Sequence, residues 1–197
     1  EISPREVVKS PFIYPAGRPI DPSKRLILEI GPGRGDFLFH LCESNPDALV
    51  IAIEIKRARV DKLIARAERR GVSNIIIVQD DARAALSRLF DDNQISEIHI
   101  QFPDPWPKNR HAKNRPVSEL LLEDCCRILK PGSAVQFVTD WEDYAAEVET
   151  AARSIAGLIC TVAPEHTFPT LFALKWKEMG RQFHSFRFEK KTSGGLQ

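Results

Sequence analysis

Short apolar runs alternate along the chain with amphipathic segments of helical length. Apolar runs rich in β-branched residues lie at 26–30, 49–54, 75–79, 95–102 and 133–139. Helix-like segments lie at 35–44, 57–70, 82–90, 116–129 and 141–156. Strands that alternate with helices indicate βαβ units, and strands apolar at successive positions are typical of a parallel sheet covered on both faces. The pattern therefore predicts a doubly wound α/β fold with a mostly parallel sheet.

The two ends of the chain depart from this alternation. Residues 1–24 contain five prolines, which interrupt regular elements, so we expect an extended N-terminal arm there. Residues 182–190 alternate in period two, which predicts an antiparallel strand added at the end of the sheet. The functional domain is therefore expected at 25–190, and residues 191–197 are expected to form a disordered tail.

Composition adds limits to this picture. Apolar residues make up 43% and charged residues 28% of the 197 residues, as in ordinary globular domains. There is neither an apolar run of membrane-spanning length nor a signal-peptide pattern, so we expect a cytoplasmic protein. The net charge of +1 argues against a histone-like binder but leaves local phosphate-binding clusters open. The four cysteines lack C-x-x-C spacing and surrounding histidines, so neither a metal site nor a disulfide is expected.

A glycine-rich loop follows the first predicted strand, with glycines at 31, 33 and 35. Such a loop lets the backbone turn sharply and lets a ligand lie against the main chain. Glu54 ends the second strand, where a carboxylate can accept hydrogen bonds from both ribose hydroxyls. Asp80 and Asp81 follow the third strand, near the expected adenine. Asp81 is the better candidate ligand, and Asp80 is expected as a surface residue or helix cap.

Two kinds of cofactor fit a loop of this type. The dinucleotide fingerprint is G-x-G-x-x-G, whereas here the third glycine comes one residue earlier. Asp36 at the start of the following helix would oppose a diphosphate, which such sites hold at a helix N-terminus. The acidic Glu29 and Asp36 suit a ligand with a cationic amino group and a sulfonium. The loop therefore favours S-adenosylmethionine over NAD.

The segment after the fourth strand reads QFPDPWPK from residue 101 to residue 108. Its three prolines stiffen the backbone at the carboxyl edge of the sheet, where ligands bind in open α/β folds, and they hold Asp104 in place. Trp106 could stack on a base or pack in the core. Four permanent cations form the basic run Lys108, Arg110, Lys113 and Arg115. Such a run is either a solvated turn or a loop that contacts phosphates.

The segment FPDPWPKNRHAKNR resembles the signature of the bacterial-type tRNA (guanine-N7-)-methyltransferase family, and the resemblance extends over about residues 26–190. It implies a Rossmann-like class I S-adenosylmethionine-dependent methyltransferase that modifies guanine N7 at position 46, in the variable loop of tRNA. It also implies that Asp104 is the catalytic carboxylate. The family's C-terminal T-x-[FY]-E motif corresponds to Thr170–Ala173, where alanine replaces the glutamate. A carboxylate contact to the substrate base is therefore missing there.

The resemblance and the glycine loop together define the candidate site. The candidate cofactor residues are Glu29, Gly31, Gly33, Gly35, Glu54, Asp81 and Asp104. The candidate substrate residues are Lys108, Asp140 and Thr170, to which the basic run adds Arg110, Lys113 and Arg115. The basic residues Arg34, Lys175, Lys177 and Arg181 are expected on a solvated face. The partner is expected to be tRNA, with no membrane and no obligatory protein partner, and the protein is expected to be a monomer or homodimer.

Three other functions remain open at this stage. Methyltransferases that act on exocyclic amines carry N/D-P-P-Y/F at the same strand end, and D-P-W is related to that pattern. The proline before Asp104 and the basic run separate this chain from them. A non-catalytic RNA-binding homologue is a further alternative, because Ala173 departs from the family motif. An NAD oxidoreductase is disfavoured, since no hydride-transfer residues follow the loop.

Overall fold

The computed structural model describes residues 12–17, 20–21, 23–106, 115–163, 174, 178–180 and 182–192. The strands are β1 (Phe12–Tyr14), β2 (Leu26–Ile30), β3 (Leu49–Glu54), β4 (Ile75–Gln79), β5 (Ile95–Gln101), β6 (Leu129–Thr139), β7 (Leu158–Val162) and β8 (His184–Lys190). The helices are α1 (Asp36–Ser44), α2 (Arg57–Arg70), α3 (Ala82–Leu89), α4 (Glu119–Ile128) and α5 (Glu142–Ser154). None of the helices in the described part of the chain combines the length and the apolar content of a membrane span.

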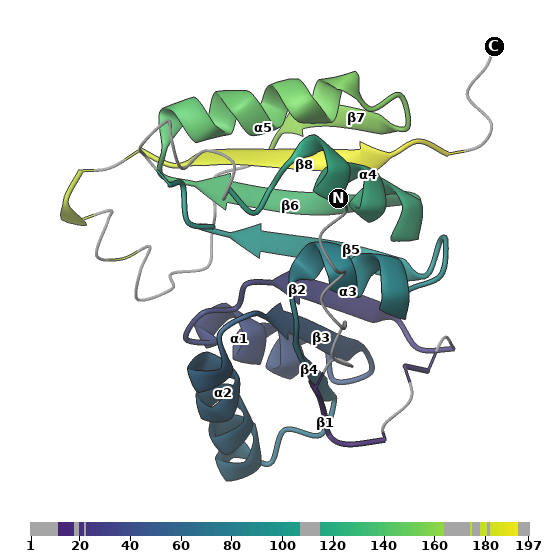
Figure 1. Cartoon of the computed structure of the whole chain (residues 1–197), viewed down its shortest axis with the longest axis vertical. Helices are drawn as coiled ribbons and strands as arrows, with labels where there is room; N and C mark the ends of the chain where they lie inside the picture. The colour runs from purple at the N-terminus through teal and green to yellow at the C-terminus, as the bar shows by residue number, and fades with distance from the viewer. Residues whose placement is uncertain are drawn as a thin grey trace, which may run out of the picture.

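One sheet runs through the molecule in the strand order β1-β4-β3-β2-β5-β6-β8-β7, which Figure 1 shows from bottom to top. Strands β2 to β6 are parallel to one another, while β1, β8 and β7 each pair with an antiparallel neighbour. The order reverses between β2 and β5. Ligands bind outside the carboxyl ends of the strands at such a switch point, so the topology itself places the site there. The predicted mostly parallel sheet with an antiparallel C-terminal strand is confirmed.

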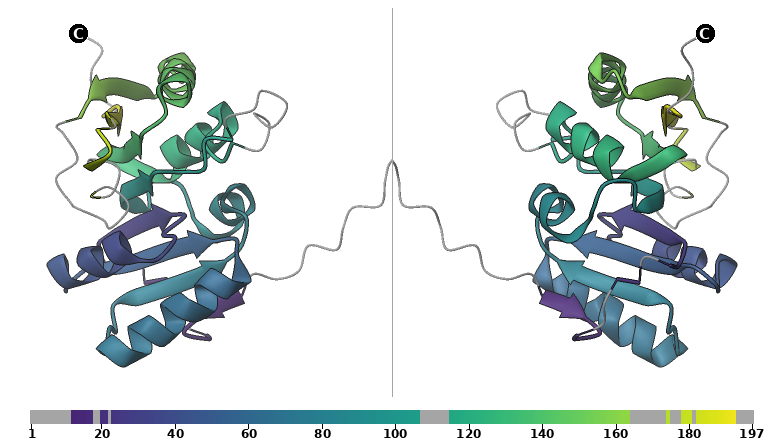
Figure 2. Two further views of the ribbon diagram at one scale, coloured as in Figure 1. Left: turned by 90° about the vertical axis from the view of Figure 1, so that its left-hand side faces the viewer. Right: turned by 90° about the vertical axis from the view of Figure 1, so that its right-hand side faces the viewer.

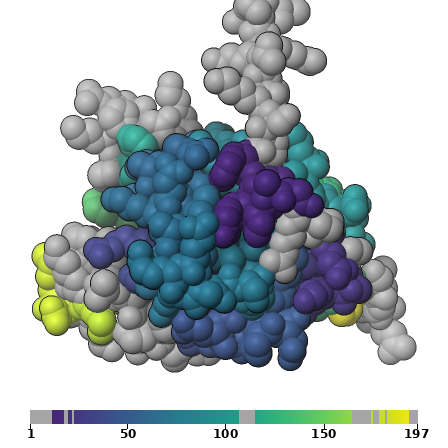
Figure 3. Space-filling view, turned by 90° about the horizontal axis from the view of Figure 1, so that it is seen from below, coloured from purple at the N-terminus to yellow at the C-terminus, as the bar shows by residue number. Residues whose placement is uncertain are grey.

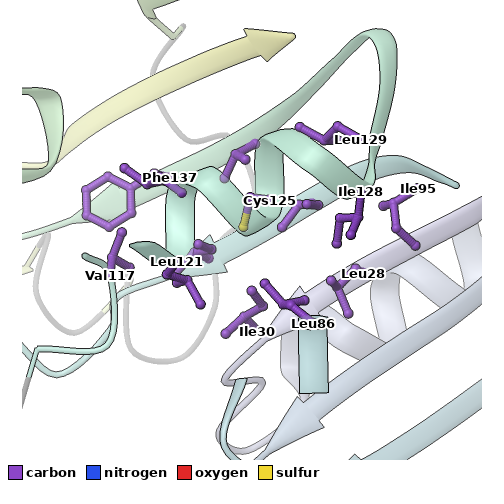
Figure 4. Packing of buried hydrophobic residues seen from close by; sticks show 14 of the residues in the cluster. Leu28, Ile30, Leu86, Ile95, Val117, Leu121, Cys125, Ile128, Leu129 and Phe137 are labelled. Carbon is purple, nitrogen blue, oxygen red and sulfur yellow. The ribbon is translucent and has the colours of Figure 1, made fainter. Parts of the chain in front are cut away.

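Helices cover both faces of the sheet (Figure 2). Alternate residues of β2 explain this arrangement, because Leu28 and Ile30 join one buried cluster and Ile27 joins the other. The first cluster packs against α3, α4 and α5, and the second packs against α1 and α2. In Figure 4, Leu121 and Cys125 of α4 face the sheet beside Phe137 of β6. The central strands β2, β3 and β4 are therefore shielded from water on both faces, which accounts for their mostly apolar runs.

The structure differs from the sequence prediction mainly at short elements. Strands β1 and β7 are not predicted, and β1 lies within the expected extended arm. The helix predicted from residue 116 begins at Glu119, because the Ser118 side chain caps it by accepting a hydrogen bond from Leu121 N at 3.3 Å. The expected tail beyond residue 192 lies outside the described residues.

Candidate active site

A cavity of about 520 Å³ opens at the carboxyl ends of β2 to β6. This volume falls within the range of small-molecule sites. The cavity brings together five of the residues predicted from the sequence, which come from five different strand ends. They are Gly31, Glu54, Asp81, Asp104 and Asp140. Glu29, Gly33 and Gly35 do not lie on its wall.

The glycine-rich loop turns directly from β2 into α1, and its three glycines all have positive φ. Gly31 has φ 72°, donates a hydrogen bond to Ile53 O at 2.9 Å, and has open space where a side chain would begin. Gly35, at the start of α1, has φ 84°, and a Cβ there would lie 2.4 Å from Leu63 Cδ2. Gly31 therefore presents bare backbone to the cavity, while Gly35 permits the close packing of α1 on α2.

Glu54 ends β3 with only 3% of its surface exposed. One carboxylate oxygen accepts a hydrogen bond from Lys56 N at 2.9 Å, and the other lies 3.4 Å from Arg59 Nη1. A buried carboxylate that is held by partners yet lines a cavity is placed to accept ligand hydrogen bonds. Glu54 is therefore a buried, hydrogen-bonded carboxylate and not a solvated charge at a strand end.

Asp80 and Asp81 both line the cavity, but the helix cap falls on Asp81 and not on Asp80. Asp81 is the N-cap of α3 and accepts a hydrogen bond from Arg83 N at 2.9 Å. Asp80 accepts a hydrogen bond from Asp81 N at 2.9 Å and forms an ion pair with Arg88. The helix cap expected at Asp80 is thus Asp81, whose side chain has one oxygen committed to the cap.

The segment after β5 holds Asp104 in an unusual backbone conformation. Phe102 has φ 47° and Trp106 has φ 41°, in the left-handed region that residues with side chains seldom adopt. Phe102 N donates a hydrogen bond to Val138 O at 2.8 Å, which fixes the start of the segment on β6. Asp104 Oδ1 accepts a hydrogen bond from Trp106 N at 3.1 Å, and the Asp104 side chain is exposed in the cavity mouth. Backbone strain of this kind concentrates at functional sites.

Arg115 lies beneath this segment rather than on the surface. Its side chain is 10% exposed, its Nε donates to Pro105 O at 2.8 Å, and its guanidinium forms an ion pair with Glu147. The guanidinium carbon also lies 5.4 Å from the ring centre of Tyr144. Burial raises the pKa of Tyr144 above its usual value, and the Tyr144 hydroxyl accepts a hydrogen bond from Val117 N at 2.9 Å. These contacts differ from the expected phosphate contact and assign Arg115 to holding the segment in place.

Glu29 and Asp36 do not line the cavity, although the sequence suggests that both would face a cationic ligand. Glu29 is 1% exposed within the sheet, and burial, with a smaller effect from the charge of Asp36, raises its pKa to about 8. Asp36 forms an ion pair with Arg66 at 2.9 Å. Among the described residues of the cavity wall, the acidic side chains are Glu54, Asp80, Asp81, Asp104 and Asp140, and the cations are Lys56, Arg59 and Arg83. Such a wall favours a ligand with positive charge and hydrogen-bond donors.

Four predicted substrate residues lie outside the described part of the chain, and Arg59, on the cavity wall, is not predicted from the sequence. Lys108, Arg110, Lys113 and Thr170 lie outside the described residues. Arg59 lines the cavity and pairs with Glu54, yet it is absent from the residues that the sequence predicts there. Its position five residues after Glu54, in the first turn of α2, is the signal that points to it.

Solved structures with this architecture include a SAM-dependent methyltransferase from Aquifex aeolicus, with a TM-score of 0.61 at 17% identity over 84% of this chain and 82% of that one. The antibiotic-resistance methyltransferase Kmr gives a TM-score of 0.63 at 17% identity, covering 86% of this chain and 88% of that one. These likenesses show that the chain has a Rossmann-like fold, the class of protein in which a site lies at the strand switch point.

Sequence comparison narrows the class. The family model described as "Putative methyltransferase" matches residues 23–181. The tRNA (guanine-N(7)-)-methyltransferase of Nitrosomonas eutropha is 34% identical over 169 residues, which cover 83% of this chain and 75% of the relative. The enzyme of the same name from Thermus thermophilus is 35% identical over 84% of this chain and 54% of its own. The chain belongs to the tRNA (guanine-N(7)-)-methyltransferase family, and the resemblance predicted from the strand-end motif is confirmed.

Proposed function

We propose that this protein transfers the methyl group of S-adenosylmethionine to N7 of a guanine in tRNA, at position 46 of the variable loop. The observation that carries the proposal is the acid-lined cavity in which Asp104 and Asp140 meet Gly31 and Glu54. The names of the relatives from Nitrosomonas eutropha and Thermus thermophilus support the choice of tRNA and of guanine N7.

The residues on the cavity wall fit this cofactor. Glu54 would accept hydrogen bonds from the ribose hydroxyls, and Gly31 offers bare backbone to the amino-acid portion. Asp81 lies at the carboxyl end of β4, on the side of the proposed adenine. When bound, S-adenosylmethionine would supply an electrophilic methyl group on a positively charged sulfur, which suits a wall of carboxylates.

The reaction depends mainly on how the protein positions guanine N7 against the methyl carbon. Guanine N7 has an in-plane lone pair and no proton, so no general base is needed. S-adenosylmethionine would supply the methyl carbon to which N7 forms its bond, and the electron pair of the carbon–sulfur bond would remain on sulfur. Positive charge thereby passes to the guanine, and Asp104 would hold the base edge and stabilise that charge. The guanine must leave its stack to reach a pocket of this kind.

A direct assay tests the proposal. The purified chain is incubated with methyl-labelled S-adenosylmethionine and an unmodified tRNA transcript, and the tRNA is then digested to nucleosides. We expect 7-methylguanosine, and its loss when the guanine at position 46 is replaced by another base. A label on an exocyclic amine would overturn the proposal in favour of a different methyltransferase. Cofactor binding without any transfer would instead indicate an RNA-binding homologue.

A further inference from the structure

A second cavity, of about 590 Å³, lies on the outer side of α2 beside the glycine-rich loop. Among the described residues of its wall, five of seven are cations and none is acidic. The lining residues are Gly33, Arg34, Arg59, Lys62, Ala65, Arg66 and Arg69. Figure 3 shows α2, in blue, on the molecular surface next to the purple β1 region. This cavity therefore has the opposite charge to the active-site cavity.

Four of the cations form a continuous stripe along α2, here named the α2 basic stripe: Arg59, Lys62, Arg66 and Arg69. Their spacing of three, four and three residues puts them on one face of the helix. The stripe extends over about 15 Å, at roughly 1.5 Å per residue. Like charges three and four residues apart destabilise a helix, a cost that ion pairs or bound phosphates offset.

The cations of the second cavity differ in whether they form ion pairs with carboxylates of the protein. Arg59 is paired with Glu54, and Arg66 is paired with Asp36. Arg34, Lys62 and Arg69 are exposed and form no ion pair within the described parts of the chain. They are therefore available to phosphates.

We propose that the α2 basic stripe is a docking surface for the phosphate backbone of the RNA substrate. The proposal rests on the proposed function and adds a second contact region to it. Arg59 lies on the wall of both cavities, so the basic and acidic surfaces adjoin each other. The five carboxylates of the active-site cavity repel phosphates, yet the guanine has to enter there. Cations directly beside the cavity hold the backbone while the base is inserted.

Lys62→Ala/Arg69→Ala tests the surface without touching residues of the cofactor site. We expect the tRNA affinity of the intact chain at low salt to fall about 10-fold or more. The slope of log affinity against log salt should flatten by about 0.7–0.9 for each phosphate that the variant no longer neutralises. The matched control is Lys24→Ala/Lys191→Ala, which removes two exposed cations that lie just before β2 and just after β8, away from α2. The control should leave both quantities unchanged.

Two further measurements separate the explanations. The affinity for S-adenosylmethionine, measured by calorimetry, should stay within about twofold of wild type in both double variants, which also reports intact folding. Lys62→Arg/Arg69→Lys retains the charge and should retain the salt slope. If Lys62→Ala/Arg69→Ala keeps the wild-type salt slope of tRNA binding and methylates tRNA like wild type, the docking surface is refuted and the proposed function is not affected. Failure of the wild-type chain to bind tRNA would overturn both.

Discussion

Arg115 Nε donates a hydrogen bond to the backbone carbonyl of Pro105 at 2.8 Å, which ties a buried guanidinium to the residue directly after Asp104. The same guanidinium is anchored by Glu147 and lies over Tyr144, both from α5. Helix α5 thus supports the segment that carries the proposed catalytic carboxylate. The position of the Asp104 carboxylate in the cavity therefore depends on these contacts with α5.

Arg115→Ala should lower kcat for methyl transfer by about 10- to 100-fold, because small displacements of a reacting group are costly. The affinity for S-adenosylmethionine and the salt slope of tRNA binding should stay close to wild type, as expected for a positioning residue. Glu147→Gln is the control, since it weakens the ion pair but keeps the bond to Pro105. A flattened salt slope in Arg115→Ala would instead return Arg115 to the set of phosphate contacts.

Asp104→Ala should abolish methyl transfer while leaving the fold intact. Asp104 carries the only carboxylate between the two strained residues Phe102 and Trp106, and losing a preorganised electrostatic group costs about 100-fold or more in rate. Single-turnover transfer to tRNA measures the chemical step, and the melting temperature checks the fold. Activity within about threefold of wild type would remove Asp104 from the mechanism.

Glu54→Ala should weaken cofactor binding far more than tRNA binding. Loss of charge-assisted hydrogen bonds to the ribose costs about 1.5–3 kcal/mol, or roughly 10- to 150-fold in dissociation constant. Calorimetric titration with S-adenosylmethionine measures this, and Glu123→Ala, an exposed glutamate on α4, serves as the control. Equal cofactor affinities in the two variants would contradict the assignment.

Arg110→Ala/Lys113→Ala should weaken tRNA binding and flatten its salt dependence, by about 0.7–0.9 for each phosphate left without its cation. Cofactor affinity should not change, because the cofactor carries no phosphate. Lys108 is left intact, since it is expected to touch the guanosine itself. Binding curves at several salt concentrations decide the matter, and an unchanged slope would make this part of the basic run a solvated turn.

Glu29→Gln should change how stability depends on pH. Because burial raises the pKa of Glu29 from 4.5 to about 8, the folded chain binds more protons than the unfolded chain between these values. The free energy of unfolding therefore falls as the pH rises through this window. The variant should melt close to wild type at pH 5 and several degrees above it at pH 9, at about 2–4 °C for each kcal/mol. His99, the cross-strand neighbour of Glu29, is present in both proteins, so comparing them isolates the contribution of Glu29. Parallel melting curves across pH would refute the buried-acid picture.

The parallel sheet could be predicted from the sequence because β2, β3 and β4 are buried on both faces, and such strands are visible as short runs that are almost wholly apolar. Strand β7 could not, because Ile159 and Val162 are exposed and its pairing depends on β8, more than twenty residues later. Strand β1 is only three residues long, and its pairing with β4 is equally non-local.

The site residues could likewise be predicted where their position follows from the order of strands and helices, and not where it depends on tertiary contacts. Strand-end positions such as Glu54 and Asp104 follow from topology, so the sequence places them correctly on the cavity. The roles of Asp80 and Asp81 depend on which of two adjacent side chains faces the first turn of α3, and no letter pattern decides that. Arg115 has the same charge as its neighbours in the basic run, and only the contacts from α5 show that it is buried.

Gly35 links the two proposed binding regions. It belongs to the loop beside the cofactor cavity, and a side chain there would meet Leu63 of α2, the helix that carries the α2 basic stripe, in a backbone conformation with φ 84° that strains any residue with a side chain. A genetic screen for loss of cofactor binding should recover changes at Glu54, and a screen for loss of RNA binding should recover changes at Lys62. Changes at Gly35 should appear in both screens, because replacing this one residue impairs cofactor binding and RNA binding together.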